Sequence, residues 1–190
     1  MTQTSPTAVA AQLPRTLEEF LAWEPNDGLK YEWNDGELIK FNGMKKEQLY
    51  IYDFLLDLFL EKGYQKTGTL VAEQDVMLNG IQMRRPDVAY FTKQQIAATR
   101  NGDDVIPEFV IEIISNNDQI NQVEKKIAEY FKAGVKVVWN IIPEEKVVYV
   151  YTSRQNVKIC LENDICSAAP VLSDFELSVN ALPRSIVDSQ

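Results

Sequence analysis

The chain has 190 residues, of which 45% are hydrophobic and 25% charged, as expected of one globular domain with a single sizeable core. Its net charge of −9 counts against a surface coated in basic residues for non-specific nucleic-acid binding, although a local basic patch is compatible with it. No histidine is present, which excludes histidine zinc sites, Ser-His and Cys-His triads and imidazole catalysis, so chemistry must rest on carboxylates, lysines, hydroxyls or a bound metal.

The domain boundaries follow from composition. We expect residues 1–14 to be a disordered lead-in, residues 15–183 to form a single domain and residues 184–190 to be a tail. The domain should open with a short helix, because Thr16 and Glu19 have the spacing of a capping box.

A hairpin and a long helix come next. Residues 31–41 predict the hairpin, with Asp35-Gly36 at its turn. Residues 46–62 predict the helix, which Gly63 should end. Apolar side chains cover so much of its circumference that the helix must be covered on more than one side. We therefore expect a two-fold homodimer, with this helix or the N-terminal hairpin at or near the interface.

The rest of the chain predicts a mixed sheet. In chain order we expect strands over 69–78, 86–92 and 108–115, a helix over 118–133 ending before Gly134, a strand over 135–142, and a hairpin of 146–152 with 156–161. From residue 170 we expect irregular chain with one short strand at most. The strand–helix–strand succession implies a right-handed parallel crossover, and the three preceding strands can form a meander. The expected fold class is α/β with a mixed sheet.

Two carboxylates stand out within these strands. Asp87 heads a strand after Arg84-Arg85-Pro86, where a turn aspartate is the alternative interpretation. Glu112 lies in a run that is apolar on both faces and so belongs to the middle of a covered sheet. A charge there is costly unless it forms a buried salt bridge or binds a metal. Two adjacent strands that each present a carboxylate favour magnesium or manganese, not zinc.

Lys126 is the candidate cation of this site. In the helix over 118–133 it falls about a quarter-turn from the centre of the apolar face, at ~100° per residue. It can therefore reach back toward the sheet, whereas Lys125 falls almost opposite and should be solvated. The alternative is a border lysine that only extends its charged end to solvent.

Several short stretches, in their order and spacing, resemble a known family. They are Leu17-Glu18-Glu19-Phe20, Tyr31-Glu32 with Asp35-Gly36-Glu37, Arg85-Pro86-Asp87-Val88-Ala89, Glu112-Ile113-Ile114-Ser115, Lys126 with Tyr130, and Ala133-Gly134-Val135 with Trp139. From about Thr16 to Pro183 the sequence is similar to the Uma-type family of restriction-endonuclease-like proteins, which belongs to the PD-(D/E)XK nuclease superfamily.

This resemblance implies roles for particular residues. Pro86-Asp87 matches the "PD" and Glu112 the "(D/E)", so Asp87 and Glu112 are the implied metal ligands. The lysine of the motif matches Lys126 on the next helix, since position 114 is isoleucine. Glu32 matches a recurring family acid and is implied to line the same site.

The sequence also departs from the family pattern. Gln48 stands where members usually have a histidine at the start of the long helix, and Ile142 where they usually have an aspartate after the tryptophan strand. Asp87, Glu112 and Lys126 are all retained.

The function expected from these features is metal-dependent cleavage of DNA by a Mg²⁺ (or Mn²⁺) endonuclease. The metal bound by Asp87 and Glu112 would activate water, and Lys126 would align that water for in-line attack. The alternatives are a catalytically inactive nuclease-fold protein that binds a nucleic acid or a protein, and a structural protein that acts through the helix over 46–62.

The cellular setting follows from the cysteines and the chain start. Cys160 and Cys166 suit a reducing cytoplasm, where no disulfide is expected between them. The first 15 residues are polar and lack the apolar core of a secretion signal. No apolar run approaches the ~20 residues of a membrane span, so we expect no membrane segment.

Overall fold

The computed structural model describes residues 13–41, 43–115 and 118–183. Most of the predicted lead-in and all of the predicted tail over 184–190 lie outside these ranges. Every helix in the described ranges is too short or too polar to cross a membrane.

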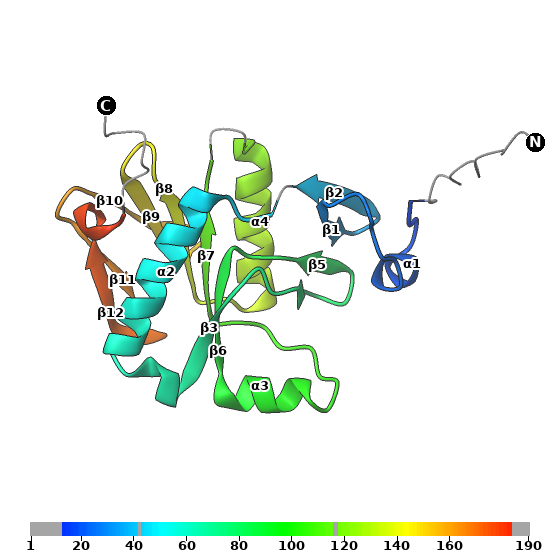
Figure 1. The fold of residues 1–190 in the computed structure, drawn as a ribbon, viewed down its shortest axis with the longest axis horizontal. Coiled ribbons are helices and arrows are strands. Elements are labelled where there is room, and N and C mark those ends of the chain that lie inside the picture. The colour runs from blue at the N-terminus through cyan, green and yellow to red at the C-terminus, as the bar shows by residue number, and fades with distance from the viewer. Residues whose placement is uncertain (1–12, 42, 116–117, 184–190) are drawn as a thin grey trace, which may run out of the picture.

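A six-stranded mixed sheet, here called the central sheet, forms the middle of the molecule (Figure 1). Its strands run in the order β10-β9-β8-β7-β6-β3, and all neighbours are antiparallel except β7 and β8. Their bounds are β3 Gly68–Ala72, β6 Val88–Thr92, β7 Phe109–Ile113, β8 Val137–Ile142, β9 Val147–Ser153 and β10 Asn156–Leu161. The predicted meander, parallel crossover and hairpin are confirmed.

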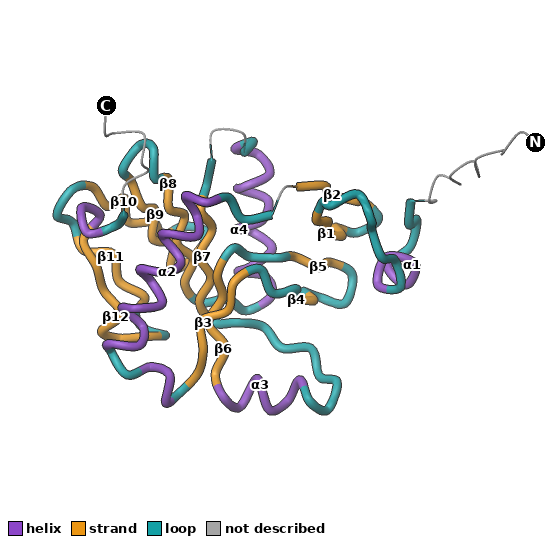
Figure 2. The backbone as a smooth tube through the Cα atoms, in the orientation of Figure 1, coloured by secondary structure: helices purple, strands orange, loops and turns teal. Residues whose placement is uncertain are grey.

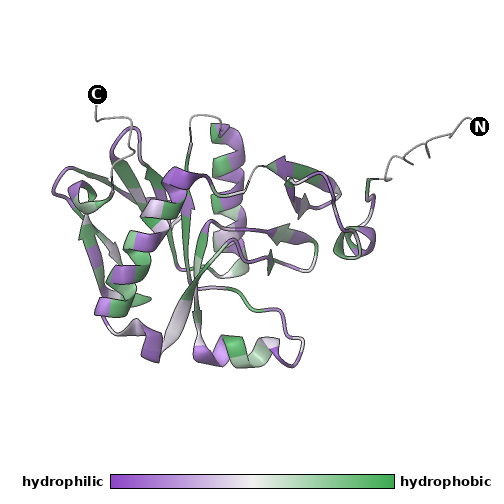
Figure 3. Ribbon diagram, viewed as in Figure 1, coloured by the Kyte–Doolittle hydropathy of each residue, from purple (hydrophilic) through white to green (hydrophobic). Residues whose placement is uncertain are grey.

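Two helices cover the two faces of the central sheet. Because side chains alternate along β7, each helix packs against a different set of β7 residues. α2 (Lys46–Glu61) packs with Phe109, Ile111 and Ile113 on one face. α4 (Ile120–Ala133) packs with Val110 on the other, which is also the face that Glu112 shares. Both helices are amphipathic, with green and purple segments in Figure 3. Both were predicted.

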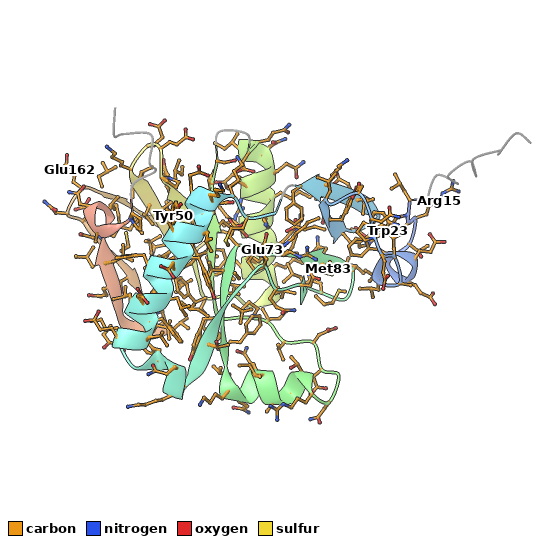
Figure 4. The ribbon with its side chains drawn as sticks, in the orientation of Figure 1. Arg15, Trp23, Tyr50, Glu73, Met83 and Glu162 are labelled. Atoms are coloured by element: carbon orange, nitrogen blue, oxygen red, sulfur yellow. The ribbon has the colours of Figure 1, made fainter. Side chains whose placement is uncertain are left out.

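A second sheet, here called the small sheet, has the order β2-β1-β5-β4. Asp35 and Gly36 have φ values of 49° and 90° in the predicted turn, as a type I′ hairpin requires. Figure 4 labels Trp23 and Met83, which pack in the core of this sheet beside α1. The bounds are α1 Leu17–Leu21, β1 Lys30–Asn34, β2 Glu37–Phe41, β4 Val76–Met77 and β5 Gln82–Arg84.

The predicted capping box of α1 forms only in part. The hydroxyl of Thr16 accepts a hydrogen bond from the N–H of Glu19 at 3.1 Å, as expected. The carboxylate of Glu19 accepts from the N–H of Arg15 at 2.7 Å instead of from Thr16. The helix nevertheless begins at the predicted place, with Thr16 as its N-cap.

The prediction of one strand over 69–78 was wrong. The chain leaves the central sheet after Ala72 and enters the small sheet as β4. At the break, Glu73 has a φ of 50°, and its carboxylate binds Lys30 and the N–H of Met44. These contacts hold a kink that hydrophobic alternation cannot reveal.

From residue 170 the prediction allowed one short strand at most, and one strand does form there, but it pairs with a preceding strand that was not predicted. β11 (Ile165–Ala168) and β12 (Leu172–Ser178) pair in a two-stranded sheet beside α2, drawn in orange in Figure 2. Phe175 of β12 stacks on Trp139 at a ring distance of 5.7 Å, so this sheet closes the core on the α2 face. Other elements not predicted are β5, α3 (Lys93–Thr99), η1 (Tyr64–Lys66) and η2 (Val179–Ala181).

Candidate active site

A cavity of about 460 Å³ opens where the small sheet meets the central sheet and α4. The chain passes from the small sheet to the central sheet between β5 and β6, which brings Asp87 to the cavity wall. All four site residues predicted from the sequence line this cavity, namely Asp87, Glu112, Lys126 and Glu32.

Asp87 immediately precedes β6, and Glu112 lies on the neighbouring strand β7. The antiparallel register pairs Val88 with Ile111, and continued by one residue it sets Asp87 opposite Glu112. The carboxylate of Asp87 accepts a hydrogen bond from the N–H of Ile113 at 2.6 Å. That bond fixes the aspartate against β7 through Oδ2, at the wall of the cavity that Asp87 lines.

Glu112 is buried under α4, with 6% of its surface exposed. Its Oε1 accepts a hydrogen bond from the hydroxyl of Tyr130 at 2.6 Å. Its Oε2 accepts one from Nζ of Lys126 at 3.0 Å. Helix α4 therefore supplies two donors, one turn apart, to a carboxylate in the middle of the sheet.

The two neighbouring lysines of α4 point in different directions, as the helical phase predicts. Lys126 turns toward the sheet, and 20% of its side chain is exposed. Lys125 has 45% of its side chain exposed, and its ammonium lies 3.3 Å from Glu37 and beside the amide of Asn34. The structure thus brings Lys126, and not Lys125, to Glu112.

Glu32 of β1 approaches the same ammonium from the other side. Its Oε1 lies 3.1 Å from Nζ of Lys126 and accepts the backbone N–H of Arg85 at 2.8 Å. Its Oε2 accepts from Nη1 of Arg84 at 2.9 Å. With 4% of its surface exposed, Glu32 is as buried as Glu112 but has more donors.

Arg84 and Glu129 complete this network, and neither was identified from the sequence. Arg84 is 2% exposed, and its Nη2 lies 2.6 Å from Oε2 of Glu129 on α4. A usable signal was present, because Glu129 is three residues after Lys126 and so shares its helix face.

The carboxylates differ in how their charge is compensated. Burial raises the pKa of Asp87 to about 6, against the ammonium of Lys126, which lowers it. Burial likewise raises the pKa of Glu112 to about 8, with Lys126 opposing the shift and Asp87 adding to it. Burial alone would raise the pKa of Glu32, but Lys126 and Arg84 outweigh it and hold this pKa below its usual value.

Lys126 itself remains an ammonium. Burial lowers its pKa, but the carboxylates of Glu112 and Glu32 outweigh burial and raise that pKa above the usual value. The side chain can therefore orient a group or offset negative charge, but it is not suited to accept a proton.

Gln48 and Ile114 also line the cavity. Nε2 of Gln48 donates to the carbonyl of Ile113 at 2.9 Å, and its Oε1 accepts from the N–H of Lys45 at 2.7 Å. Gln48 thus ties the start of α2 to the strand that carries Glu112. Ile142 ends β8, and it is not among the cavity residues.

Among the residues that the structure describes, no group of three or more Asp, Glu, Cys or His side chains is placed to hold a metal ion. Asp87 and Glu112 nevertheless fit magnesium, which proteins commonly bind through one or two carboxylates, with waters and substrate phosphates completing the shell. The raised pKa values of both residues support the fit, since each carboxylate is short of positive charge.

Comparisons with known proteins match the chain to a family and to a fold. The model of the Uma2 family, described as "Putative restriction endonuclease", matches residues 17–180. A crystal structure described as "a putative nuclease belonging to DUF820", from Anabaena variabilis, is similar with a TM-score of 0.75 and 24% identity, over 88% of this chain and 97% of that chain. At this identity the likeness concerns the fold, which confirms the predicted restriction-endonuclease-like α/β architecture. No curated protein matches the sequence.

Proposed function

Because this chain belongs to the Uma2 family of restriction-endonuclease-like proteins, we propose that it is a magnesium-dependent endonuclease that hydrolyses phosphodiester bonds in DNA. The observation that carries the proposal is the convergence of Asp87, Glu112 and Lys126 in one cavity. Each comes from a different element, and only the folded chain unites them.

The proposed roles follow from the contacts. Asp87 and Glu112 would hold the magnesium ion, which when bound lowers the pKa of a water and offsets charge on the phosphate. Lys126, fixed as an ammonium, would orient the attacking water and stabilise negative charge that develops on the phosphate oxygens. Manganese, with similar oxygen ligands, could substitute for magnesium.

The balance of charge in the cavity suits a polyanionic substrate better than the net charge of the whole chain does. The chain has 19 basic and 28 acidic residues. Five of each sign line the cavity, so basic residues are enriched there relative to the chain. They are Lys40, Lys45, Arg84, Arg85 and Lys126 against Glu32, Glu37, Asp87, Glu112 and Asp118. A phosphate backbone would meet a local balance of charge rather than the net negative charge of the chain.

Cleavage of supercoiled plasmid tests this function. The wild-type protein should nick or linearise DNA in magnesium and not in excess chelator, and Asp87→Asn should be inactive under the same conditions. Asp57→Asn, on the exposed side of α2, is a matched control that should stay active. If the wild-type protein neither cuts DNA nor binds magnesium, the alternative of an inactive nuclease fold that binds a nucleic acid or a protein is correct.

We further propose a two-fold homodimer. Within the described chain α2 leaves three large apolar or aromatic side chains exposed: Leu49 at 52%, Tyr50 at 41% and Leu60 at 45%. Tyr50 is labelled on α2 in Figure 4. Two copies would let two sites address both strands of a duplex. Sedimentation at micromolar concentration should show twice the 21.7 kDa chain mass, and a purely monomeric species would exclude this assembly.

The proposed location is the cytoplasm. Cys160 and Cys166 are both buried free thiols, which suits a reducing compartment. Fractionation of the native cells should recover the protein with cytoplasmic markers, and recovery outside the cytoplasm would refute the location.

A further inference from the structure

Four charged residues close a ring between the small sheet and α4. Lys126 lies 3.1 Å from Glu32, Glu32 lies 2.9 Å from Arg84, and Arg84 lies 2.6 Å from Glu129. Lys126 and Glu129 are three residues apart on one helix, so the backbone of α4 closes the ring. Glu32, Arg84 and Glu129 are 4%, 2% and 7% exposed.

The contacts of Glu32 argue against a role as a metal ligand. Its Oε1 already accepts the N–H of Arg85 and faces Lys126, and its Oε2 is bound by Arg84. Two cations and a backbone donor therefore surround one carboxylate. A further divalent cation would have to displace one of these partners.

Lys126 needs a second partner for a geometric reason. Its four-carbon stem is flexible, so a single contact leaves the ammonium free to swing. The first contact, Glu112, is a proposed metal ligand whose oxygens are shared when the site is loaded. Glu32 is not such a ligand, so it gives the ammonium a charged anchor that does not change with metal, beside a longer contact of 3.4 Å with the carbonyl of Arg85.

We propose that Glu32 is the positioning residue of Lys126, holding the ammonium beside Glu112 and at the cavity wall. The inference rests on the proposed nuclease function, in which Lys126 acts on the attacking water and the phosphate. It assigns to the hairpin of β1 and β2 a part in catalysis, because the hairpin carries the anchor. Glu129 contacts Arg84 but not Lys126, and it does not line the cavity.

This difference provides a matched pair of variants. Glu32→Gln and Glu129→Gln each replace a buried carboxylate bound to Arg84 with an amide of the same shape. Only Glu32→Gln removes a charged partner of Lys126. Both should lower the melting temperature, because each weakens a buried ion pair.

Kinetics then separate positioning from structural support. Glu32→Gln should lower kcat on the order of 10²-fold, since a misplaced catalytic group loses about that much. KM for DNA should change less than about threefold, and Glu129→Gln should keep kcat within about threefold. An equal fall of kcat in both variants would overturn the proposal. So would loss of magnesium binding by Glu32→Gln in calorimetry, because Glu32 would then be a ligand.

A second measurement does not depend on activity. Reductive methylation, followed residue by residue with fragment-ion mass spectrometry, reports how well each lysine is held, and Lys125 is the internal reference. Lys126 should react more slowly than Lys125 in the wild type and in Glu129→Gln, and should approach Lys125 in Glu32→Gln. Unchanged protection of Lys126 in Glu32→Gln would overturn the proposal. Wild-type protein that fails to cut DNA would refute the nuclease function instead, and the methylation result would still decide whether Glu32 anchors Lys126.

Discussion

Glu32 and Glu112 contact the same ammonium from opposite sides, yet their surroundings differ. Glu32 has Arg84, Lys126 and a backbone N–H around it, and its pKa lies below the usual value. Glu112 has Lys126 and a tyrosine hydroxyl, with Asp87 nearby, and its pKa is raised to about 8. One end of the cavity is compensated by the protein itself, and the other is short of positive charge.

This difference in surrounding donors separates buried acids with a structural role from those that can bind a cation. A carboxylate with enough fixed donors stays ionised in the folded protein and holds its neighbours in place. Asp87 and Glu112 must instead take up protons or a metal to relieve their burial and mutual repulsion. Four predictions, made on three variants, can break or sharpen this distinction.

The largest effect should come from Lys126, the residue shared by the two ends. Lys126→Ala should reduce metal-dependent cleavage by about 10²- to 10⁴-fold, the range that a positioned catalytic group supplies. Lys125→Ala should change the rate less than about twofold, because that side chain is largely exposed. Initial rates of plasmid nicking in saturating magnesium measure both. Loss of activity in Lys125→Ala alone would mean that the helix phase has been assigned to the wrong lysine.

The second-largest effect should come from removing one carboxylate of the Asp87–Glu112 pair, which should weaken metal binding. Asp87→Asn should lower magnesium affinity by about 10- to 100-fold, since it deletes one of two anionic ligands. Calorimetry without DNA measures this directly, and Asp57→Asn should bind magnesium like the wild type. Equal affinities in the wild type and Asp87→Asn would place the metal elsewhere.

The same variant should stabilise the metal-free protein at high pH. A carboxyl whose folded pKa is raised to about 6 from 3.8 stabilises the fold below the lower value, and that stability is lost as pH rises through the upper one. As pH rises from 4 to 7, the free energy of unfolding of Asp87→Asn should therefore increase relative to that of the wild type. We expect about 2 kcal/mol in the free energy of unfolding, after screening at this half-buried site. Urea denaturation in chelator measures the gain, and a difference independent of pH would refute it.

Tyr130 should give the smallest effect. Tyr130→Phe deletes the hydroxyl that donates to Glu112 and preserves the packing of the ring in the core. The free energy of unfolding should fall by about 1 kcal/mol, the usual value of one hydrogen bond. Magnesium affinity should change little, because Lys126 still holds the other oxygen. A loss of metal binding as large as that in Asp87→Asn would make Tyr130 part of the metal site.

The sequence predicts the site residues better than it predicts the residues and elements that support them. Glu112 stands out because a charge in a strand apolar on both faces needs a reason. Lys126 follows from helical phase, with the family resemblance pointing to the same residue. Arg84 and Glu129 are harder to identify, because their pairing joins a three-residue strand to a helix 45 positions away. The helix face that Glu129 shares with Lys126 suggests Glu129 but does not identify Arg84 as its partner.

The missed elements have local causes of the same kind. α3 has a single large apolar side chain, Ile96, so it shows no helical periodicity. In β12 the alternation of Phe175 and Leu177, which Val179 continues at the start of η2, was a usable signal. A register shift in β11 next to Ala168 interrupts the pattern before it reaches Leu172. The two-stranded sheet therefore depends on the pairing of β11 with β12 across this shift, which the local sequence pattern does not predict.

The distribution of bound metal tests the central claim most directly. A crystal grown in manganese and measured at the anomalous edge should show a peak about 2.0–2.6 Å from oxygens of Asp87 and Glu112. Lys126 should remain in contact with Glu32, and no peak should lie beside Glu32. An anomalous peak bound by Glu32, or none at Asp87 and Glu112, would contradict the division of the cavity into a compensated end and a cation-binding end.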